Sequence, residues 1–303
     1  MNMCVPDSLR FRGLLLLASL LSCLNIFCQG KLPSEAGSSN PPDKGSWTIY
    51  TPFDWAHDGN PVYGNFITVY SDGAGADLKQ QVCELAEQQF SDIMLEFQFE
   101  NTADFIFPPG YNRIDIYINR FHTENIAWAY WGGFLITIRV EPLDTRWQRY
   151  LNYTAKHELV HVFEFLIEGK IDLFADVWFK EGLAVYLADP ETAGFNPVDT
   201  VAELDAWIAR NQDHPDQGNP IAIHRQSDFP PNADRTYYYL MFELAIRYLL
   251  DERGGMGSLD NVLDLMYDIR NNIAFESSFE DRFELNMEEF ETEFYTRLRT
   301  YLQ

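Results

Sequence analysis

Two histidines and a glutamate form the pattern H-E-x-x-H at His157, Glu158 and His161. Residues four apart are neighbours on one face of a helix, so both imidazoles can reach one Zn²⁺. Glu158 projects to the side of that pair, where it can act on a water molecule that the metal activates. The other side chains of this stretch are apolar: Leu159, Val160, Val162, Phe163, Phe165, Leu166 and Ile167. A helix that is apolar all round is buried, and buried imidazoles and carboxylates need partners, which a metal ion supplies.

A third ligand is expected from a second helix, predicted over Trp178–Leu187. H-E-x-x-H is short and also occurs by chance in helices without metal. The prediction of a zinc site therefore depends on this second helix as well. Glu181 lies near its start, between apolar residues. Two histidines and one carboxylate, with the fourth position open, are typical of catalytic zinc, whereas structural sites close the shell, usually with cysteine. Glu164, three residues past His161 on nearly the same face, is a rival third ligand, but a supporting or surface role is favoured for it.

The two stretches together resemble the gluzincin metallopeptidases. H-E-L-V-H from position 157 and W-F-K-E-G-L-A-V-Y from position 178 are similar to the zinc motifs of the thermolysin-like and aminopeptidase N-like group, and above all of the bacterial peptidase MA-like family. The resemblance implies a zinc peptidase with His157, His161 and Glu181 as ligands and Glu158 as general base. Nineteen residues separate His161 from Glu181, one more than in the aminopeptidase N-like proteins, which weakens kinship with those aminopeptidases.

A tyrosine is expected to complete the site. The resemblance places it at the start of a helix that ends in a pattern like I-R-Y-L, here at positions 246–249. Counting back from that pattern selects Tyr239, with Tyr238 in reserve. A phenol can donate a hydrogen bond to the oxyanion as a carbonyl becomes tetrahedral. The alternative is that Tyr239 belongs to an aromatic core stripe. The resemblance extends from about Phe66 to the C-terminus.

One aminopeptidase feature is missing. The related aminopeptidases carry G-x-M-E-N in a strand beside the cleft, and its glutamate captures the free amine of the substrate. The corresponding stretch here, Trp131–Ile136, has no carboxylate. Exopeptidase action therefore loses its main support, and the choice between endo- and exopeptidase stays open. Trp128, Tyr130 and Trp131 precede the strand; they either line a cleft or, as we favour, belong to the core.

The N-terminal residues 1–30 are expected to be a signal for export. Arg10 and Arg12 precede an apolar run that is too short to span a bilayer. The sequence L-L-S-C resembles a bacterial lipobox, which would make Cys23 a lipidated N-terminus; ordinary signal cleavage near Gly30 is the alternative. Residues 31–46, rich in Pro, Gly and Ser, are predicted to be a flexible linker. The protein is therefore expected outside the cytoplasm, either secreted or lipid-anchored at a bacterial membrane.

Composition excludes several classes of partner. The net charge of −24 argues against nucleic acid, which needs a basic surface, and against electrostatic docking on anionic lipid. Three of the four cysteines lie in the signal segment, so Cys83 is expected to be a small core residue rather than half of a disulfide. The expected partner is a peptide or protein substrate, with membrane attachment through a lipid anchor only. The oligomeric state is not indicated.

The remaining body, residues 47–303, is predicted to be one α+β metallopeptidase-like domain. An α/β lobe over 47–150 and a helical lobe over 151–303, which carries the zinc site, would flank a cleft. Periodicity predicts elements in the first lobe at Trp47–Tyr50, Asn65–Tyr70, Asp77–Phe97, Ile114–Ile118 and Phe134–Val140. Further helices are predicted at Val198–Arg210, Asp234–Asp251, Ser258–Arg270 and Met287–Leu302. His57, His214 and His224 are expected in loops. The resemblance places the last strand beside the cleft, where a substrate backbone can pair with it.

Two other functions stay open on the sequence. One is a zinc-bearing binding or scaffolding module that no longer catalyses a reaction. The other is a zinc hydrolase that acts on a non-peptide amide or ester. Metal content and the substrate range of any chelator-sensitive activity distinguish the three.

Overall fold

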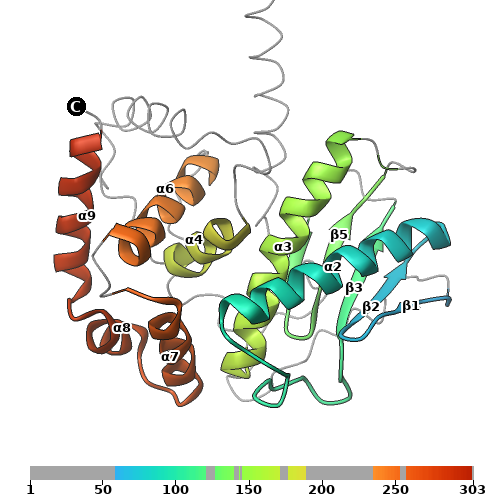
Figure 1. The fold of residues 1–303 in the computed structure, drawn as a ribbon, viewed down its shortest axis with the longest axis horizontal. Coiled ribbons are helices and arrows are strands. Elements are labelled where there is room, and N and C mark those ends of the chain that lie inside the picture. The colour runs from blue at the N-terminus through green and yellow to red at the C-terminus, as the bar shows by residue number, and fades with distance from the viewer. Residues whose placement is uncertain are drawn as a thin grey trace, which may run out of the picture.

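The computed structural model describes residues 59–120, 127–139, 143, 145–170, 177–188, 235–252 and 257–301. Over these residues the chain is a mixed α+β protein with one five-stranded sheet and seven α-helices (Figure 1). Some of the predicted features lie outside the described residues. They are the signal segment 1–30, the linker 31–46, the strand Trp47–Tyr50, the helix Val198–Arg210, and the loop residues His57, His214 and His224.

The sheet has a parallel centre and two antiparallel edges. Its strands are β1 (Val62–Tyr63), β2 (Ile67–Ser71), β3 (Ile114–Asn119), β4 (Ala127–Tyr130) and β5 (Gly133–Thr137), in the order β1-β2-β3-β5-β4. Strands β2, β3 and β5 run parallel, whereas β1 and β4 pair antiparallel with their neighbours. The predictions for β2, β3 and β5 are confirmed to within a few residues.

The expectation that a substrate backbone can pair with the last strand is wrong. Strand β5 lies inside the sheet, between β3 and β4, and the edge position belongs to β4. The reason is a tight turn at Trp131 and Gly132, which folds the chain back from β4 into β5. Gly132 has a φ of 101°, a conformation that a side chain disfavours. Trp128 and Tyr130, expected ahead of the strand, lie within β4 itself.

The two faces of the sheet meet different surroundings. Because side chains alternate along a strand, Ile114, Ile116 and Ile118 of β3 share one face. They pack in the main core with α2 (Ala76–Glu96) and α3 (Thr145–Glu168), which cover this face in Figure 1. We call the opposite face the far face; it carries Thr68, Tyr70, Asp115, Tyr117, Tyr130 and Leu135. Tyr117, Tyr130 and Leu135 form a separate small apolar cluster there, which agrees with a core role for Tyr130.

Five further α-helices make up a helical lobe beside the sheet (Figure 1). They are α4 (Val177–Ala188), α6 (Arg235–Arg247), α7 (Leu259–Arg270), α8 (Phe275–Phe283) and α9 (Met287–Tyr301), and a π-helical turn over Tyr248–Glu252 extends α6. Trp178 is fully buried at their centre, with ring centroids 5.3 Å from Phe290 and 6.0 Å from Phe279. The helices predicted at α2, α6, α7 and α9 are confirmed; α8 and the π-helical turn were not predicted.

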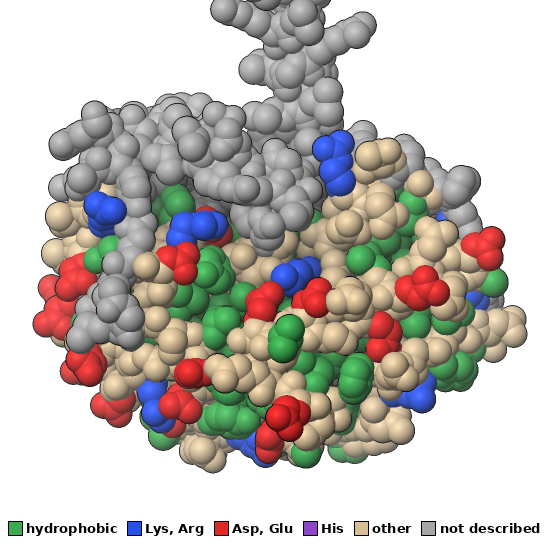
Figure 2. Space-filling view, in the orientation of Figure 1, with side chains coloured by type: hydrophobic (Ala, Val, Ile, Leu, Met, Phe, Trp, Pro, Cys, Tyr) green, Lys and Arg blue, Asp and Glu red, His purple; other side chains and the backbone are tan. Residues whose placement is uncertain are grey.

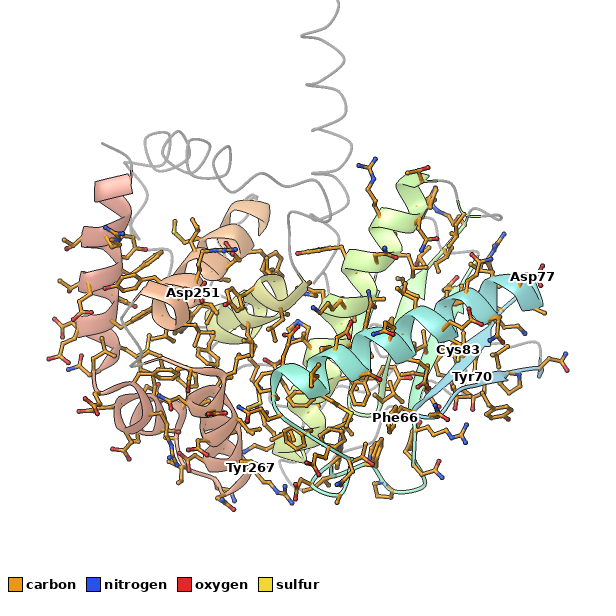
Figure 3. All side chains as sticks on the ribbon, viewed as in Figure 1. Phe66, Tyr70, Asp77, Cys83, Asp251 and Tyr267 are labelled. Carbon is orange, nitrogen blue, oxygen red and sulfur yellow. The ribbon has the colours of Figure 1, made fainter. Side chains whose placement is uncertain are left out.

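Helix α2 is tied to both the sheet and α3, because Gln89 donates a hydrogen bond to the backbone oxygen of Asn152 in α3, at 2.6 Å. The Glu87 carboxylate accepts hydrogen bonds from the backbone N–H groups of Phe66 and Ile67 at the start of β2, at 2.7 and 2.8 Å. Cys83, on the same helix, is 2% exposed, which confirms its role as a small core residue (Figure 3).

Acidic side chains are spread over the face of the molecule in Figure 2 rather than gathered in one patch.

Candidate metal centre

Helix α3 carries the H-E-x-x-H residues on turns that are buried between the sheet and the helical lobe. His157, Glu158 and His161 are 3%, 2% and 8% exposed. Leu159 and Val160, which lie between them in sequence, are fully buried. The apolar surroundings that predicted a buried helix are therefore present, and the polar groups within it need partners.

Helix α4 is held in place by contacts on both sides of Glu181. Lys180 Nζ donates a hydrogen bond to Glu168 Oε2 of α3 at 2.8 Å, and both side chains are buried. On the other side, a Cβ atom on Gly182 would lie 2.5 Å from the backbone oxygen of Phe242. A glycine is therefore needed for α4 to approach α6 so closely. These contacts direct the Glu181 side chain towards α3.

The ring nitrogens of both histidines meet one carboxylate oxygen. Nε2 of His157 lies 3.3 Å from Oε2 of Glu181, and Nε2 of His161 lies 3.4 Å from the same oxygen. One ligand atom from each residue can be chosen so that all lie within 4.8 Å of one another. Ligands about 2.0–2.1 Å from a tetrahedral ion are separated by roughly 3.3 Å. The structure thus brings the three predicted ligands together in a group that can hold a metal ion.

Glu164 supports one of the histidines from behind. Its Oε2 lies 3.0 Å from Nδ1 of His161, and the residue is 1% exposed. An ionised carboxylate only accepts hydrogen bonds, so Nδ1 is the donor and Nε2 is left to face Glu181. The favoured supporting role of Glu164 agrees with this geometry, whereas the alternative of a place on the helix surface is wrong.

Glu158 lies beside the metal-ligand group, against the edge strand of the sheet. Its carboxylate accepts a hydrogen bond from the backbone of Ala129 in β4. Burial raises the pKa of Glu158 to about 8; the charge of His161 and the Ala129 hydrogen bond act in the opposite direction, while Glu181 adds to the rise. A carboxyl group with a pKa near neutrality can both accept and release a proton.

Charge and burial compete at the ligands themselves. Burial lowers the pKa of His157. Burial acts on His161 in the same direction, but the Glu181 and Glu164 carboxylates outweigh it and raise the pKa of His161 well above its usual value. Burial would raise the pKa of Glu181, yet His161 and His157 hold it well below its usual range. Burial and the neighbouring carboxylates thus act on the two imidazoles to different extents.

Two residues that the sequence did not single out, Tyr153 and Glu243, act on or near this centre, although the Glu243 carboxylate also accepts a hydrogen bond from Arg247 Nε on its own helix, at 2.9 Å. Tyr153 lies one turn before His157 on α3, with ring centroids 6.0 Å apart. Burial and then the carboxylates of Glu181, Glu243 and Glu158 raise the pKa of Tyr153 far above its usual value, so its phenol lies in their combined field. The spacing of four from His157 could have identified Tyr153. Glu243 could not be found that way, because it comes from α6.

Tyr239 is buried in the helical lobe. It is 1% exposed, and its ring centroid lies 6.3 Å from that of Phe242. Both the core role and a hydrogen bond to a bound substrate are compatible with this position, so the catalytic role stays a prediction. The reserve candidate, Tyr238, belongs to the same helix, but its side chain lies outside the described part of the structure.

Comparisons with known proteins add no relative: the chain matches no protein-family model and no curated protein. Function must therefore be inferred from the geometry of the centre. Across the residues that the structure describes, no helix combines the length and apolar character that crossing a bilayer requires.

Proposed function

We propose that this protein is a zinc-dependent metallopeptidase of the gluzincin type. The observation that supports this most is the approach of His157 Nε2 and His161 Nε2 to Oε2 of Glu181, at 3.3 and 3.4 Å. Two imidazoles and one carboxylate are a ligand set of catalytic zinc sites. The buried Oε1 of Glu158 has no hydrogen-bond partner in the described structure. Such an atom calls for an ion, a water molecule or a substrate group nearby.

The residues around this group have separable roles. Zinc held by His157, His161 and Glu181 would supply Lewis acidity, which polarises a scissile carbonyl and makes water a better nucleophile. Glu158 would take the proton of the attacking water and pass it to the leaving amine. The Ala129 hydrogen bond would keep the Glu158 carboxylate oriented for both transfers. Tyr239 is our proposed donor to the substrate oxyanion.

The proposed substrate is a peptide or protein that the enzyme meets outside the cytoplasm. The basic start and apolar run of residues 1–30 support export, and L-L-S-C supports a lipid anchor at Cys23 as one of two outcomes. The fold supports a gluzincin assignment only in outline: a mixed sheet covered by the H-E-x-x-H helix, next to a helical lobe.

Metal analysis joined to unbiased peptide cleavage profiling tests the proposal, on protein that starts near Ser46. We expect one zinc per chain and chelator-sensitive cleavage. His157→Ala should lose both zinc and cleavage, whereas Asp77→Asn, an exposed change on α2, should keep both. Unchanged zinc content in His157→Ala would show that the ligand assignment is wrong.

Other outcomes identify the alternatives. Protein that holds zinc but cleaves no peptide would favour a binding or scaffolding module that has lost catalysis. Chelator-sensitive hydrolysis of esters or small amides without peptide cleavage would favour the non-peptide hydrolase.

A further inference from the structure

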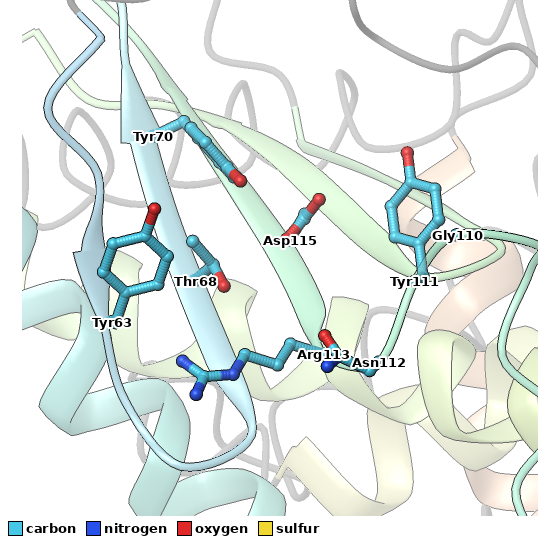
Figure 4. A pocket seen from close by; sticks show the side chains of 8 residues that line it. All are labelled: Tyr63, Thr68, Tyr70, Gly110, Tyr111, Asn112, Arg113 and Asp115. Atoms are coloured by element: carbon cyan, nitrogen blue, oxygen red, sulfur yellow. The ribbon is translucent and has the colours of Figure 1, made fainter.

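A cavity of about 440 Å³ opens on the far face of the sheet, apart from the metal centre. Its walls come from β1, β2, β3 and the turn that precedes β3 (Figure 4). Helices α2 and α3 cover the opposite face, so the cavity and the metal centre lie on different sides of one sheet (Figure 1). Small-molecule sites have volumes of roughly 300–1,000 Å³, so the cavity is large enough to take a ligand.

A single carboxylate lies at the middle of this cavity. Asp115 is 9% exposed, and its side chain points into the space between Tyr70 and Tyr111 (Figure 4). Thr68 provides a side-chain hydrogen bond to the carboxylate. Burial raises the pKa of Asp115 to about 7, and the Thr68 hydrogen bond acts against this rise. A buried carboxylate held mainly by a hydroxyl group is poorly solvated, and a cation would stabilise it.

Aromatic rings form the walls around Asp115. Burial and then the charge of Asp115 raise the pKa of Tyr70 to about 12 and also raise the pKa of Tyr111. Both phenols therefore stay neutral, and both lie close enough to Asp115 for its charge to raise their pKa. The faces of aromatic rings attract cations. The cavity already shows this: the Arg113 guanidinium carbon lies 5.7 Å from the ring centroid of Tyr63.

The floor of the cavity is fixed by the neighbouring strands. Tyr130 of β4 donates a hydrogen bond from its hydroxyl to the backbone oxygen of Asp115, at 3.0 Å. Gly133 of β5 pairs with Asp115, and a Cβ atom on it would lie within 1.9 Å of that same oxygen. Only glycine allows this approach. Asp115 is thus held on a rigid element, which lowers the entropic cost of binding a ligand.

The geometry points to a binding site for the protonated primary amine of a small molecule. An ammonium group donates three hydrogen bonds, and the Asp115 carboxylate and the tyrosine hydroxyls offer acceptors for them. The tyrosine rings would cover the alkyl chain that carries the amine. An anion close to the Asp115 carboxylate would be repelled in this poorly screened site, and the other charged residue of the lining, Arg113, lies over the ring of Tyr63.

Calorimetric titration of the full chain with n-butylammonium chloride at low ionic strength tests this site. n-Butanol, of similar shape but without charge, should bind at least about tenfold more weakly, because it cannot form a charge-assisted hydrogen bond. Asp115→Asn keeps the side-chain size and should weaken butylammonium binding by about ten- to a hundredfold. Asp77→Asn makes the same charge change on the exposed side of α2 and should leave binding unchanged.

A second variant keeps the proposal falsifiable if Asp115→Asn fails to fold. Tyr111→Leu removes one ring from the wall and should weaken binding about three- to tenfold. Circular dichroism of each variant checks the fold. Equal binding by wild type and Asp115→Asn, or equal affinity for butanol and butylammonium, would overturn the assignment. Binding of calcium chloride that depends on Asp115, without butylammonium binding, would also overturn it, because the site would then be one for a metal ion.

Discussion

Glu181 and Asp115 are both 9% exposed, yet their surroundings move the pKa in opposite directions. Glu181 faces two imidazoles, which hold its pKa well below the usual range. Asp115 faces a threonine hydroxyl and tyrosine rings, and burial raises its pKa to about 7. The comparison shows that the neighbouring groups, rather than the exposed fraction, decide the charge of a buried carboxyl group.

The two carboxylates therefore differ in what they ask of a ligand. The pKa of Glu181 is already lowered within a group that can hold a metal ion. Asp115 remains costly as an anion at neutral pH until a cation enters its cavity. Substitution of Glu181 should therefore change metal binding, whereas substitution of Asp115 should change the free energy of unfolding and leave metal binding intact.

The largest difference is expected when each carboxylate is neutralised. Glu181→Gln removes a proposed ligand, so zinc affinity should fall by more than about a hundredfold. Loss of a residue that only hydrogen-bonds a ligand costs about 10–100-fold, and loss of the ligand itself should cost more. Cleavage should fall with it. Asp115→Asn should keep zinc and cleavage at wild-type levels. Metal content after dialysis and peptide turnover measure both, and equal zinc loss in the two variants would show that the sites are not independent.

Glu158→Gln should separate zinc binding from proton transfer within the metal centre. The amide keeps the size of the side chain but cannot accept a proton, so turnover should fall by about 10²–10⁴-fold. Zinc content should stay at one ion per chain, because Glu158 is not among the three proposed ligands. Steady-state kinetics and metal analysis on the same sample check this. Unchanged turnover would remove Glu158 from the mechanism.

Asp115→Asn should change how stability depends on pH. The folded-state pKa of about 7 lies above the ordinary value of 3.8, so the folded protein binds the proton more tightly. Wild-type stability should therefore fall as pH rises from about 4 to 7. The variant should lack this loss and exceed wild type at pH 8 by up to roughly 4 kcal/mol. Urea unfolding at pH 4 and pH 8 measures it; a difference that does not grow between these pH values would contradict a raised pKa.

The smallest expected effect concerns the support of His161. Glu164→Leu removes the acceptor of the Nδ1 hydrogen bond and should weaken zinc binding by about 10–100-fold. Glu164→Gln keeps an acceptor oxygen and should recover most of that affinity. Competition with a chelator ranks the three proteins. If the glutamine variant binds zinc no better than the leucine variant, the role of Glu164 is not orientation of His161.

Periodicity was a sound guide to α2, α6, α7 and α9, because helices with a long apolar stripe are specified locally. It missed α8, a helix of only nine residues over Phe275–Phe283. It also gave no indication of the order of the last two strands, which depends on the tight turn at Gly132 and on the pairing of β5 with β3.

The sequence by itself determined that His157 and His161 share a face, because a spacing of four on a helix is a local property. It also indicated Glu181, through the apolar setting of that residue in a second helix. Only the tertiary structure decided that the backbone of Ala129 hydrogen-bonds the Glu158 carboxylate, that the charge of Glu243 acts on Tyr153, and that Asp115 lies among tyrosines. Strand alternation assigns a side chain to a face, but what lies across from it depends on packing between elements distant in the chain.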